Sequence, residues 1–195
     1  MNELLPDGII GTHGLLADNW FRFIDTNLYN IRPIKYLEIG TFYGANAISV
    51  HNTYAAHPNS RIDCIDAWTA YPEYPGTTQI EQDQIYSNFQ SNLVLAGCAN
   101  KTRVFRGFSV NILPTLMDAA YDIIYVDGNN SPTFMMEDAV LSFRKLAVGG
   151  IVIINNFTAK SVEDSQWAID AFIHVFQGKI RVLGVNHTQI FIQKN

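Results

Sequence analysis

Glu38, Gly40 and Gly44 are the first residues whose types and spacing suggest chemistry. They form an E-x-G-x-x-x-G turn directly after an apolar run. Glycine lets a chain turn tightly and lets the backbone approach a ligand closely, and a helix that follows such a turn presents free N–H groups. An ordinary strand-to-helix turn would also account for the two glycines. Their spacing differs from the G-x-G-x-x-G of dinucleotide sites, which disfavours a nicotinamide-dependent redox enzyme.

Asp66 ends the next apolar run, about one strand–helix–strand unit after Gly40. A carboxylate at this place can accept hydrogen bonds from both hydroxyls of a ribose. A helix N-cap or a solvated strand end is the alternative. Because the glycine turn lies upstream, we favour the interpretation that Asp66 holds the ribose of an adenosyl ligand.

Both features require a sheet that brings the ends of neighbouring strands together. Five short runs are mostly apolar on both faces, as in the central strands of a covered parallel sheet, and two more follow them. The predicted strands are 35–39, 61–66, 102–107, 122–127, 150–154, 179–185 and 188–193. Helical patterns separate them, over 45–56, 78–96, 109–117 (with Ser109 as N-cap), 133–146 and 161–176.

This alternation predicts an α/β fold, a Rossmann-like three-layer sandwich. We expect a seven-stranded, mostly parallel sheet whose last strand is antiparallel, because Asn186-His187 is typical of a hairpin turn. No linker or repeat divides the chain, so residues 1–195 are expected to form a single domain. In it, an N-terminal helical segment (1–30, with an amphipathic helix from about 15 to 29) precedes the core of 35–195.

Several motifs, in this order, resemble class I S-adenosylmethionine-dependent methyltransferases. They are the E-x-G-x-x-x-G turn, the acidic end of the second strand, Gly107-Phe108-Ser109, the run YDIIYVDG over 121–128, and the run DAVLSFRKL over 138–146 that leads into VGGI. They are most similar to small-molecule and sugar O-methyltransferases with a D-G-x-H loop and a G-G-I-x-I-x-D-D strand. The resemblance extends from about residue 35 to residue 195.

The resemblance implies that S-adenosylmethionine lies across the strand ends. The turn at Gly40 would surround its methionine end, Asp66 its ribose and the later loops its adenine, while Asp127 would face the transferring methyl group. The cofactor-binding residues implied are Glu38, Gly40, Thr41, Phe42, Gly44, Asp66, Ala67, Trp68, Phe108, Ser109 and Asp127.

The chain departs from this subgroup at the acidic residues near the methyl group. Asn130 stands where the loop usually has histidine, and Asn155-Asn156 stand where the strand usually ends in paired aspartates. Asp127 and Asn130 are therefore the candidate catalytic residues, and Asp127, Asn155 and Asn156 the candidate metal ligands. One charge with amide oxygens would hold a divalent cation loosely, with Mn²⁺ preferred to Mg²⁺. Asp127 acting alone as a base is the alternative.

Two segments are candidates for binding the methyl acceptor. The loop over 68–76 is rich in aromatic residues, and Tyr71 and Tyr74 could stack on a sugar or an aromatic ring. His13, in Gly11-Thr12-His13-Gly14, lies in a segment that could fold over the mouth of the site. A plain proline-stiffened loop remains an alternative for the first segment.

Composition limits the partners. The net charge of −5 offers no basic field for nucleic acid or an anionic membrane, and no apolar run is long enough to span a bilayer. Cys64 and Cys98 lie in unlike contexts and are interpreted as reduced thiols. With no secretory signal pattern at the start, the expected location is cytoplasmic. A homo-oligomer remains open.

The resulting prediction is an S-adenosylmethionine-dependent O-methyltransferase that acts on a hydroxyl of a small molecule, with a sugar or glycan favoured. The alternative is a non-catalytic cofactor-binding or scaffold domain that has lost the acids, which the three asparagines support.

Overall fold

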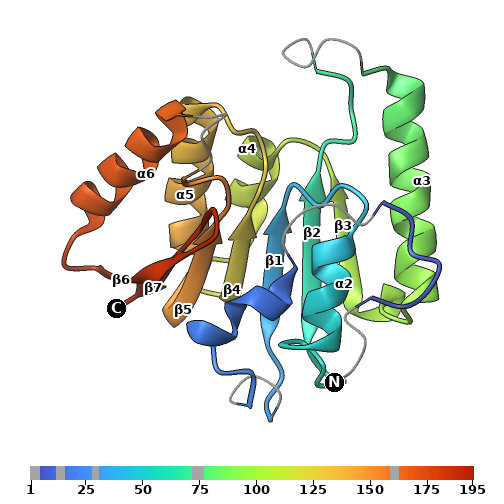
Figure 1. Cartoon of the computed structure of the whole chain (residues 1–195), viewed down its shortest axis with the longest axis horizontal. Coiled ribbons are helices and arrows are strands. Elements are labelled where there is room, and N and C mark those ends of the chain that lie inside the picture. Colours follow the sequence, from blue (N-terminus) through green and yellow to red (C-terminus); the bar gives the residue numbers. More distant parts are fainter. Residues whose placement is uncertain (1–4, 12–15, 28–30, 72–76, 159–162) are drawn as a thin grey trace.

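The computed structural model describes residues 5–11, 16–27, 31–71, 77–158 and 163–195, and these form a seven-stranded sheet (Figure 1). The strand order is β3-β2-β1-β4-β5-β7-β6. Only β7 runs antiparallel to its neighbours β5 and β6, and every other pairing is parallel. The predicted fold is thus confirmed. The strands are β1 Lys35–Ile39, β2 Arg61–Asp66, β3 Thr102–Arg106, β4 Tyr121–Val126, β5 Leu146–Ile154, β6 Ile180–Asn186 and β7 Gln189–Lys194.

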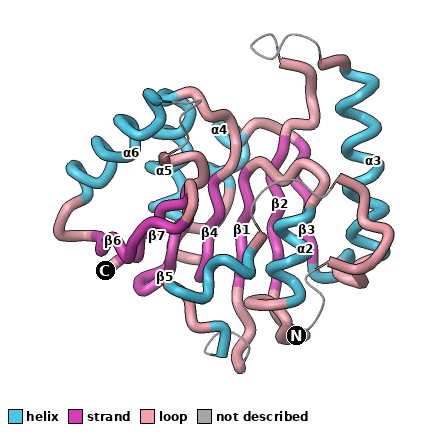
Figure 2. The backbone as a smooth tube through the Cα atoms, in the orientation of Figure 1, coloured by secondary structure: helices cyan, strands magenta, loops and turns pink. Residues whose placement is uncertain are grey.

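Helices cover both faces of the sheet and make three layers (Figure 2). One face packs against η1 (Ala17–Arg22), α2 (Ala45–Asn52) and α3 (Gln79–Leu95). The other packs against α5 (Pro132–Lys145) and α6 (Glu163–Phe176), with the short η3 (Leu113–Thr115) beside them. Two further short helices, η2 (Ala99–Lys101) and α4 (Ser109–Ile112), flank β3.

The side chains of strand β4 alternate between the two hydrophobic cores, one on each face of the sheet. Tyr125 and Ile123 pack toward α2 and η1, whereas Ile124 and Val126 pack toward α5 and α6. Successive side chains on a strand point to opposite faces, so a strand covered on both sides must be apolar at nearly every position. This is the pattern that predicts the central strands.

The connection from β3 to β4 differs from the sequence prediction, which is a single helix over 109–117. Here α4 ends at Ile112 and a 3₁₀ turn follows, with Pro114 in its first positions. Proline lacks an N–H and disfavours helical geometry in the residue before it, which ends the α-helix early. Phe108, and not the expected Ser109, is the N-cap. The Ser109 side chain is instead hydrogen-bonded to Asp138 of α5.

The predicted amphipathic helix from 15 to 29 is wrong in the part that the structure describes. The longest helix described there is the 3₁₀ helix Ala17–Arg22, which buries Ala17 and Trp20. The chain leaves the helical path over 23–25, and residues 26 and 27 are helical again. The Asp25 side chain before them accepts a hydrogen bond from the backbone N–H of Asn27, as an N-cap does, so one continuous helix is replaced by two separate starts.

No helix in the described ranges has the length and apolar character to cross a membrane. Cys64 and Cys98 are both buried free thiols, as expected.

Candidate functional site

A cavity of about 690 Å³ opens at the carboxyl edge of the sheet, the upper edge in Figure 1. It lies where the chain leaves β1, β2, β3 and β4, so residues distant in sequence meet around it. Most of the predicted cofactor residues line it: Glu38, Gly40, Thr41, Phe42, Asp66, Ala67, Phe108, Ser109 and Asp127. Gly44 and Trp68 do not.

Both glycines of the turn are required by geometry. Gly40 has φ of +81°, and a Cβ there would lie 1.9 Å from the backbone oxygen of Asp127. Gly44 has φ of +84° as the N-cap of α2, and a Cβ there would lie 2.8 Å from the ring of Phe89. Gly40 therefore lets the end of β1 approach the end of β4, while Gly44 lets the turn pack on α3.

Asp66 joins the glycine loop to the loop after β2. One carboxylate oxygen accepts from the backbone N–H of Phe42 at 2.8 Å and the other from that of Trp68 at 2.9 Å. Phe42 and Trp68 both have positive φ, +53° and +41°, which side-chain-bearing residues rarely adopt. The carboxylate thus stabilises two strained loops, and its lining position leaves it within reach of a ligand.

Trp68 does not lie along the cavity as the resemblance implies. Its indole is fully buried, packs on Phe89 with ring centroids 4.9 Å apart, and donates to the backbone oxygen of Phe42 at 3.0 Å. The side chain thus supports the wall of the site from behind. A large aromatic side chain such as Trp68 suits stacking on adenine as well as packing in the core, so the sequence alone does not distinguish the two roles.

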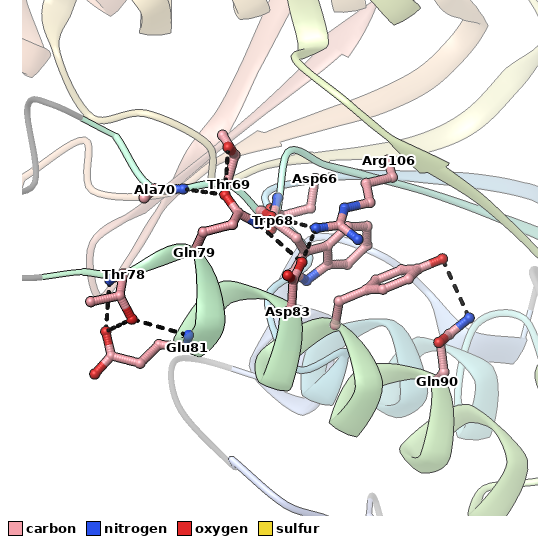
Figure 3. A network of polar contacts seen from close by, with 11 residues as sticks. Asp66, Trp68, Thr69, Ala70, Thr78, Gln79, Glu81, Asp83, Gln90 and Arg106 are labelled. Atoms are coloured by element: carbon pink, nitrogen blue, oxygen red, sulfur yellow. Dashed lines mark hydrogen bonds and ion pairs between the residues drawn. The ribbon is translucent and has the colours of Figure 1, made fainter.

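Polar side chains of α3 and β3 hold the same loop (Figure 3). Gln79 accepts from Thr69 and from the backbone N–H of Ala70, and donates to the backbone oxygen of Trp68. Arg106 donates to that oxygen at 2.9 Å and pairs with Asp83. Helix α3 begins beside the loop with a capping box in which Thr78 and Glu81 bond reciprocally.

Glu38 is a buried carboxyl at the floor of the cavity. The Tyr36 hydroxyl and the Asn46 amide both donate to it, the latter at 3.0 Å. Burial raises its pKa to about 8 although these hydrogen bonds oppose the shift. At neutral pH this group is largely protonated.

Asp127 follows β4 and accepts three side-chain hydrogen bonds. Asn155 donates to Oδ1 at 3.0 Å, Asn156 to the same oxygen at 3.5 Å, and Tyr125 to Oδ2 at 3.3 Å. Burial raises the pKa of Asp127 to about 6, and the bonds from Asn155 and Tyr125 limit the rise. The group is therefore mostly a carboxylate at neutral pH, in the protonation state of a base.

The asparagines do not fit the expected metal site. Asn155 and Asn156 turn their amide nitrogens to Asp127, and nitrogens that donate hydrogen bonds cannot bind a cation. The Asn155 oxygen accepts from Thr188, and Asn156 also donates to the oxygen of Asn130. Among the described residues, no group of three or more His, Cys, Asp or Glu could hold a metal.

The acceptor residues are only partly described. Tyr71 lines the cavity, with its ring edge-on to Phe108 at a centroid distance of 5.4 Å. Tyr74 and His13 lie outside the described residues, although Gly11, close before His13, is in the cavity wall. Phe42, Phe108 and Phe134 are each more than 40% exposed and line the same cavity, so its mouth is largely aromatic.

The sequence analysis assigns no role to several polar residues that line the cavity, among them Tyr125, Asn46 and Asp138. Tyr125 precedes Asp127 by two positions, and this period-two spacing was the signal that both side chains share one face of the strand. Asp138 is buried on α5, and burial raises its pKa to about 6. Nothing local in the sequence indicates that α5 turns it toward the cavity.

A family model described as a methyltransferase domain matches residues 37–157. No curated protein sequence matches the chain.

Solved structures share the fold at low identity. The O-methyltransferase TomG of Streptomyces achromogenes, in complex with SAM, has a TM-score of 0.64 at 19% identity, covering 93% of this chain and 80% of that one. The O-methyltransferase of Bacillus cereus, in complex with SAH, has 0.63 at 14% identity, covering 94% and 83%. A putative rRNA methylase of Clostridium thermocellum has 0.66 at 12% identity, covering 93% and 97%.

Proposed function

The chain belongs to the methyltransferase domain family, and we propose that it transfers a methyl group from S-adenosylmethionine to a hydroxyl group of a small molecule. The observation that carries the proposal is the single cavity wall shared by the glycine turn, Asp66, Phe108 and Asp127. Its volume of about 690 Å³ is within the range of small-molecule and cofactor sites. Two structural neighbours are O-methyltransferases by name, which supports the choice of a hydroxyl acceptor.

The cavity residues suit such a cofactor in kind. Carboxyl groups of Glu38 and Asp127 lie at the end nearest β1 and β4, where a sulfonium would find the charge of Asp127 and an ammonium would favour the ionised form of Glu38. Asp66 offers its carboxylate to the ribose, and Ala67 and Phe108 offer apolar surface to the adenine. S-adenosylmethionine would supply a methyl group on a positively charged sulfur.

Asp127 is the proposed base. The acceptor hydroxyl loses its proton to the carboxylate while its oxygen forms the new bond to the methyl carbon, and the carbon–sulfur bond breaks. The products are a methyl ether, S-adenosylhomocysteine and a protonated Asp127, so charge and atoms balance. The protein contributes alignment of donor and acceptor and a positioned proton acceptor. Because the asparagine amides donate to Asp127, we propose that this step uses no metal.

For the acceptor we propose a ring compound that carries the hydroxyl, a sugar or a phenol. The exposed rings of Phe42 and Phe134 offer flat apolar faces at the mouth of the cavity. A nucleic acid, the acceptor that the name of the putative rRNA methylase would suggest, is disfavoured by the net charge of −5.

The test has two arms. Calorimetry should detect binding of S-adenosylmethionine and S-adenosylhomocysteine, and methyl-labelled donor should then transfer label to at least one member of a panel of glycans and phenols. Binding without transfer to any acceptor would favour the alternative, a non-catalytic cofactor-binding or scaffold domain, which the three asparagines around Asp127 support. Absence of binding would contradict both.

A further inference from the structure

We infer that two consecutive residues at the entry to β7, Thr188 and Gln189, are positioning residues for the carboxylate of Asp127. The inference rests on the proposed function, in which Asp127 is the base. Thr188 and Gln189 lie more than 60 positions after Asp127 in the chain. Each nevertheless reaches one oxygen of its carboxylate through a single intermediate side chain.

Gln189 acts on Oδ2 through Tyr125. The Trp20 indole donates to the Gln189 side-chain oxygen at 3.1 Å, and the Gln189 nitrogen donates to the Tyr125 hydroxyl oxygen at 3.2 Å. An indole N–H can only donate, so it determines which way the Gln189 amide faces. The Tyr125 oxygen therefore accepts from Gln189, which leaves its proton for Asp127, 3.3 Å away.

Thr188 acts on Oδ1 through Asn155. The Thr188 hydroxyl donates to the Asn155 side-chain oxygen at 3.1 Å, and the Asn155 nitrogen donates to Oδ1 of Asp127 at 3.0 Å. A carboxylate oxygen only accepts, so this direction is fixed from the Asp127 end. The backbone oxygen of Thr188 also accepts from the N–H of Phe157 at 2.8 Å, which holds the turn against the end of β5.

These two relays fix the plane of a carboxylate that is half-buried in the cavity wall. A buried charge without hydrogen-bond partners is costly and would turn or become protonated. The titratable groups that act on Asp127 are Tyr125, by hydrogen bond, and Glu38, by charge; the other donors are the amides of Asn155 and Asn156. With both oxygens held, the lone pair of Oδ2 that accepts none of these three bonds keeps one direction.

The packing of β7 against the rest of the protein does not depend on the polar groups of Thr188 and Gln189. The three residues that follow, Ile190, Phe191 and Ile192, are buried and supply the hydrophobic contacts of the strand on both faces of the sheet. Gln189 is itself fully buried, and its side-chain hydrogen bonds are to Trp20 and Tyr125. The polar side chain of Gln189 therefore belongs to the hydrogen-bond network around Asp127.

The test compares Thr188→Val and Gln189→Met with matched controls from the same region. Thr158→Val removes a hydroxyl that bonds across the same turn, to the backbone oxygen of His187, and Gln193→Met removes a glutamine amide from the same strand. We expect kcat to fall about tenfold in each test variant, the upper end for a lost hydrogen bond between neutral groups, with KM and affinity for S-adenosylhomocysteine within twofold. Both controls should keep the wild-type kcat.

Double variants test whether the residues act through their intermediates. The double variant Gln189→Met/Tyr125→Phe should have the kcat of Tyr125→Phe alone, because the two substitutions interrupt the same relay. Additive losses, wild-type kcat in the single variants, or an equal loss in the controls would overturn the inference.

A second readout does not depend on turnover. The carboxyl ¹³C resonance of Asp127, assigned with Asp127→Asn, should titrate at higher pH in Thr188→Val and Gln189→Met than in wild type, and not in the controls. An unshifted resonance overturns the inference. Were wild-type protein to bind the cofactor yet transfer no methyl group, the proposed reaction would fail, whereas this resonance would still decide whether the relays orient Asp127.

Discussion

The side-chain nitrogen of Asn155 donates to Oδ1 of Asp127 at 3.0 Å, and the oxygen of the same amide faces Thr188. A cation beside Asp127 would need that oxygen turned the other way, which would break both hydrogen bonds. We therefore expect EDTA at millimolar concentration to leave methyl transfer unchanged. Initial rates before and after dialysis against chelator measure this.

The matching experiment adds Mn²⁺ or Mg²⁺ to the dialysed protein. No stimulation is expected. A chelator-sensitive rate that either ion restores would show that the amides rotate to bind metal and would reinstate the cation site predicted from the sequence.

Cofactor binding should release a proton from Glu38. Its pKa of about 8 in the free protein keeps it protonated at pH 7, and an ammonium beside it would favour the carboxylate. Affinity for S-adenosylhomocysteine should therefore rise with pH up to about 8 and then level off. Calorimetry in buffers of different ionisation enthalpy should find close to one proton released at pH 7. Glu38→Gln should abolish the release; release that persists in that variant would assign the proton to another group.

Asp127→Asn should lower kcat about 10²- to 10³-fold, in the range for loss of a general base, and spare affinity for S-adenosylhomocysteine, whose sulfur carries no positive charge. In the wild type, kcat should rise as the pH passes through about 6, where the carboxyl ionises. Rate measurements from pH 5 to 8 check both. Full activity in Asp127→Asn would remove this residue from the mechanism.

Ionisation of the Asp127 carboxyl, which should raise kcat, should lower the stability of the folded protein. Its pKa is raised on folding, so the folded state holds the proton more tightly, and stability falls as the pH rises from about 4 to about 6. At pH 7, Asp127→Asn should accordingly raise the free energy of unfolding by about 1–2 kcal/mol. Chemical denaturation at pH 4 and pH 7 measures the difference, and a variant less stable than wild type at pH 7 would contradict it.

Gly40→Ala should disrupt the site much more than Gly149→Ala. Both glycines have φ near +80°, but a Cβ at Gly149 meets nothing within 4 Å, whereas one at Gly40 overlaps the backbone of Asp127. Left-handed strain costs roughly 1–2 kcal/mol in each, and the overlap adds about 1–3 kcal/mol in Gly40→Ala alone. Calorimetry should show cofactor affinity lost only in Gly40→Ala. Equal effects in the two variants would mean that strain, and not the approach of β1 to β4, explains Gly40.

The sequence predicts the strands and the glycine turn because their signals are local. Apolar runs and the spacing of Gly40 and Gly44 are visible within a few residues, and β1 and β2 have the predicted bounds. The burial of Trp68 and the direction of the Asn155 amide depend instead on partners more than 20 residues away. Such directions follow from tertiary packing, so a cation site at Asp127 was as reasonable an expectation as a hydrogen-bonded one.

The place of β7 between β5 and β6 has a consequence for biosynthesis. A ribosome delivers β7 after the other six strands, so until it emerges β5 has an unpaired edge and Asp127 lacks Thr188 and Gln189. Nascent chains stalled before this strand should bind chaperones through that edge. The carboxylate acquires its full set of supporting bonds only when translation of the fold is complete, so truncated chains cannot carry the assembled site.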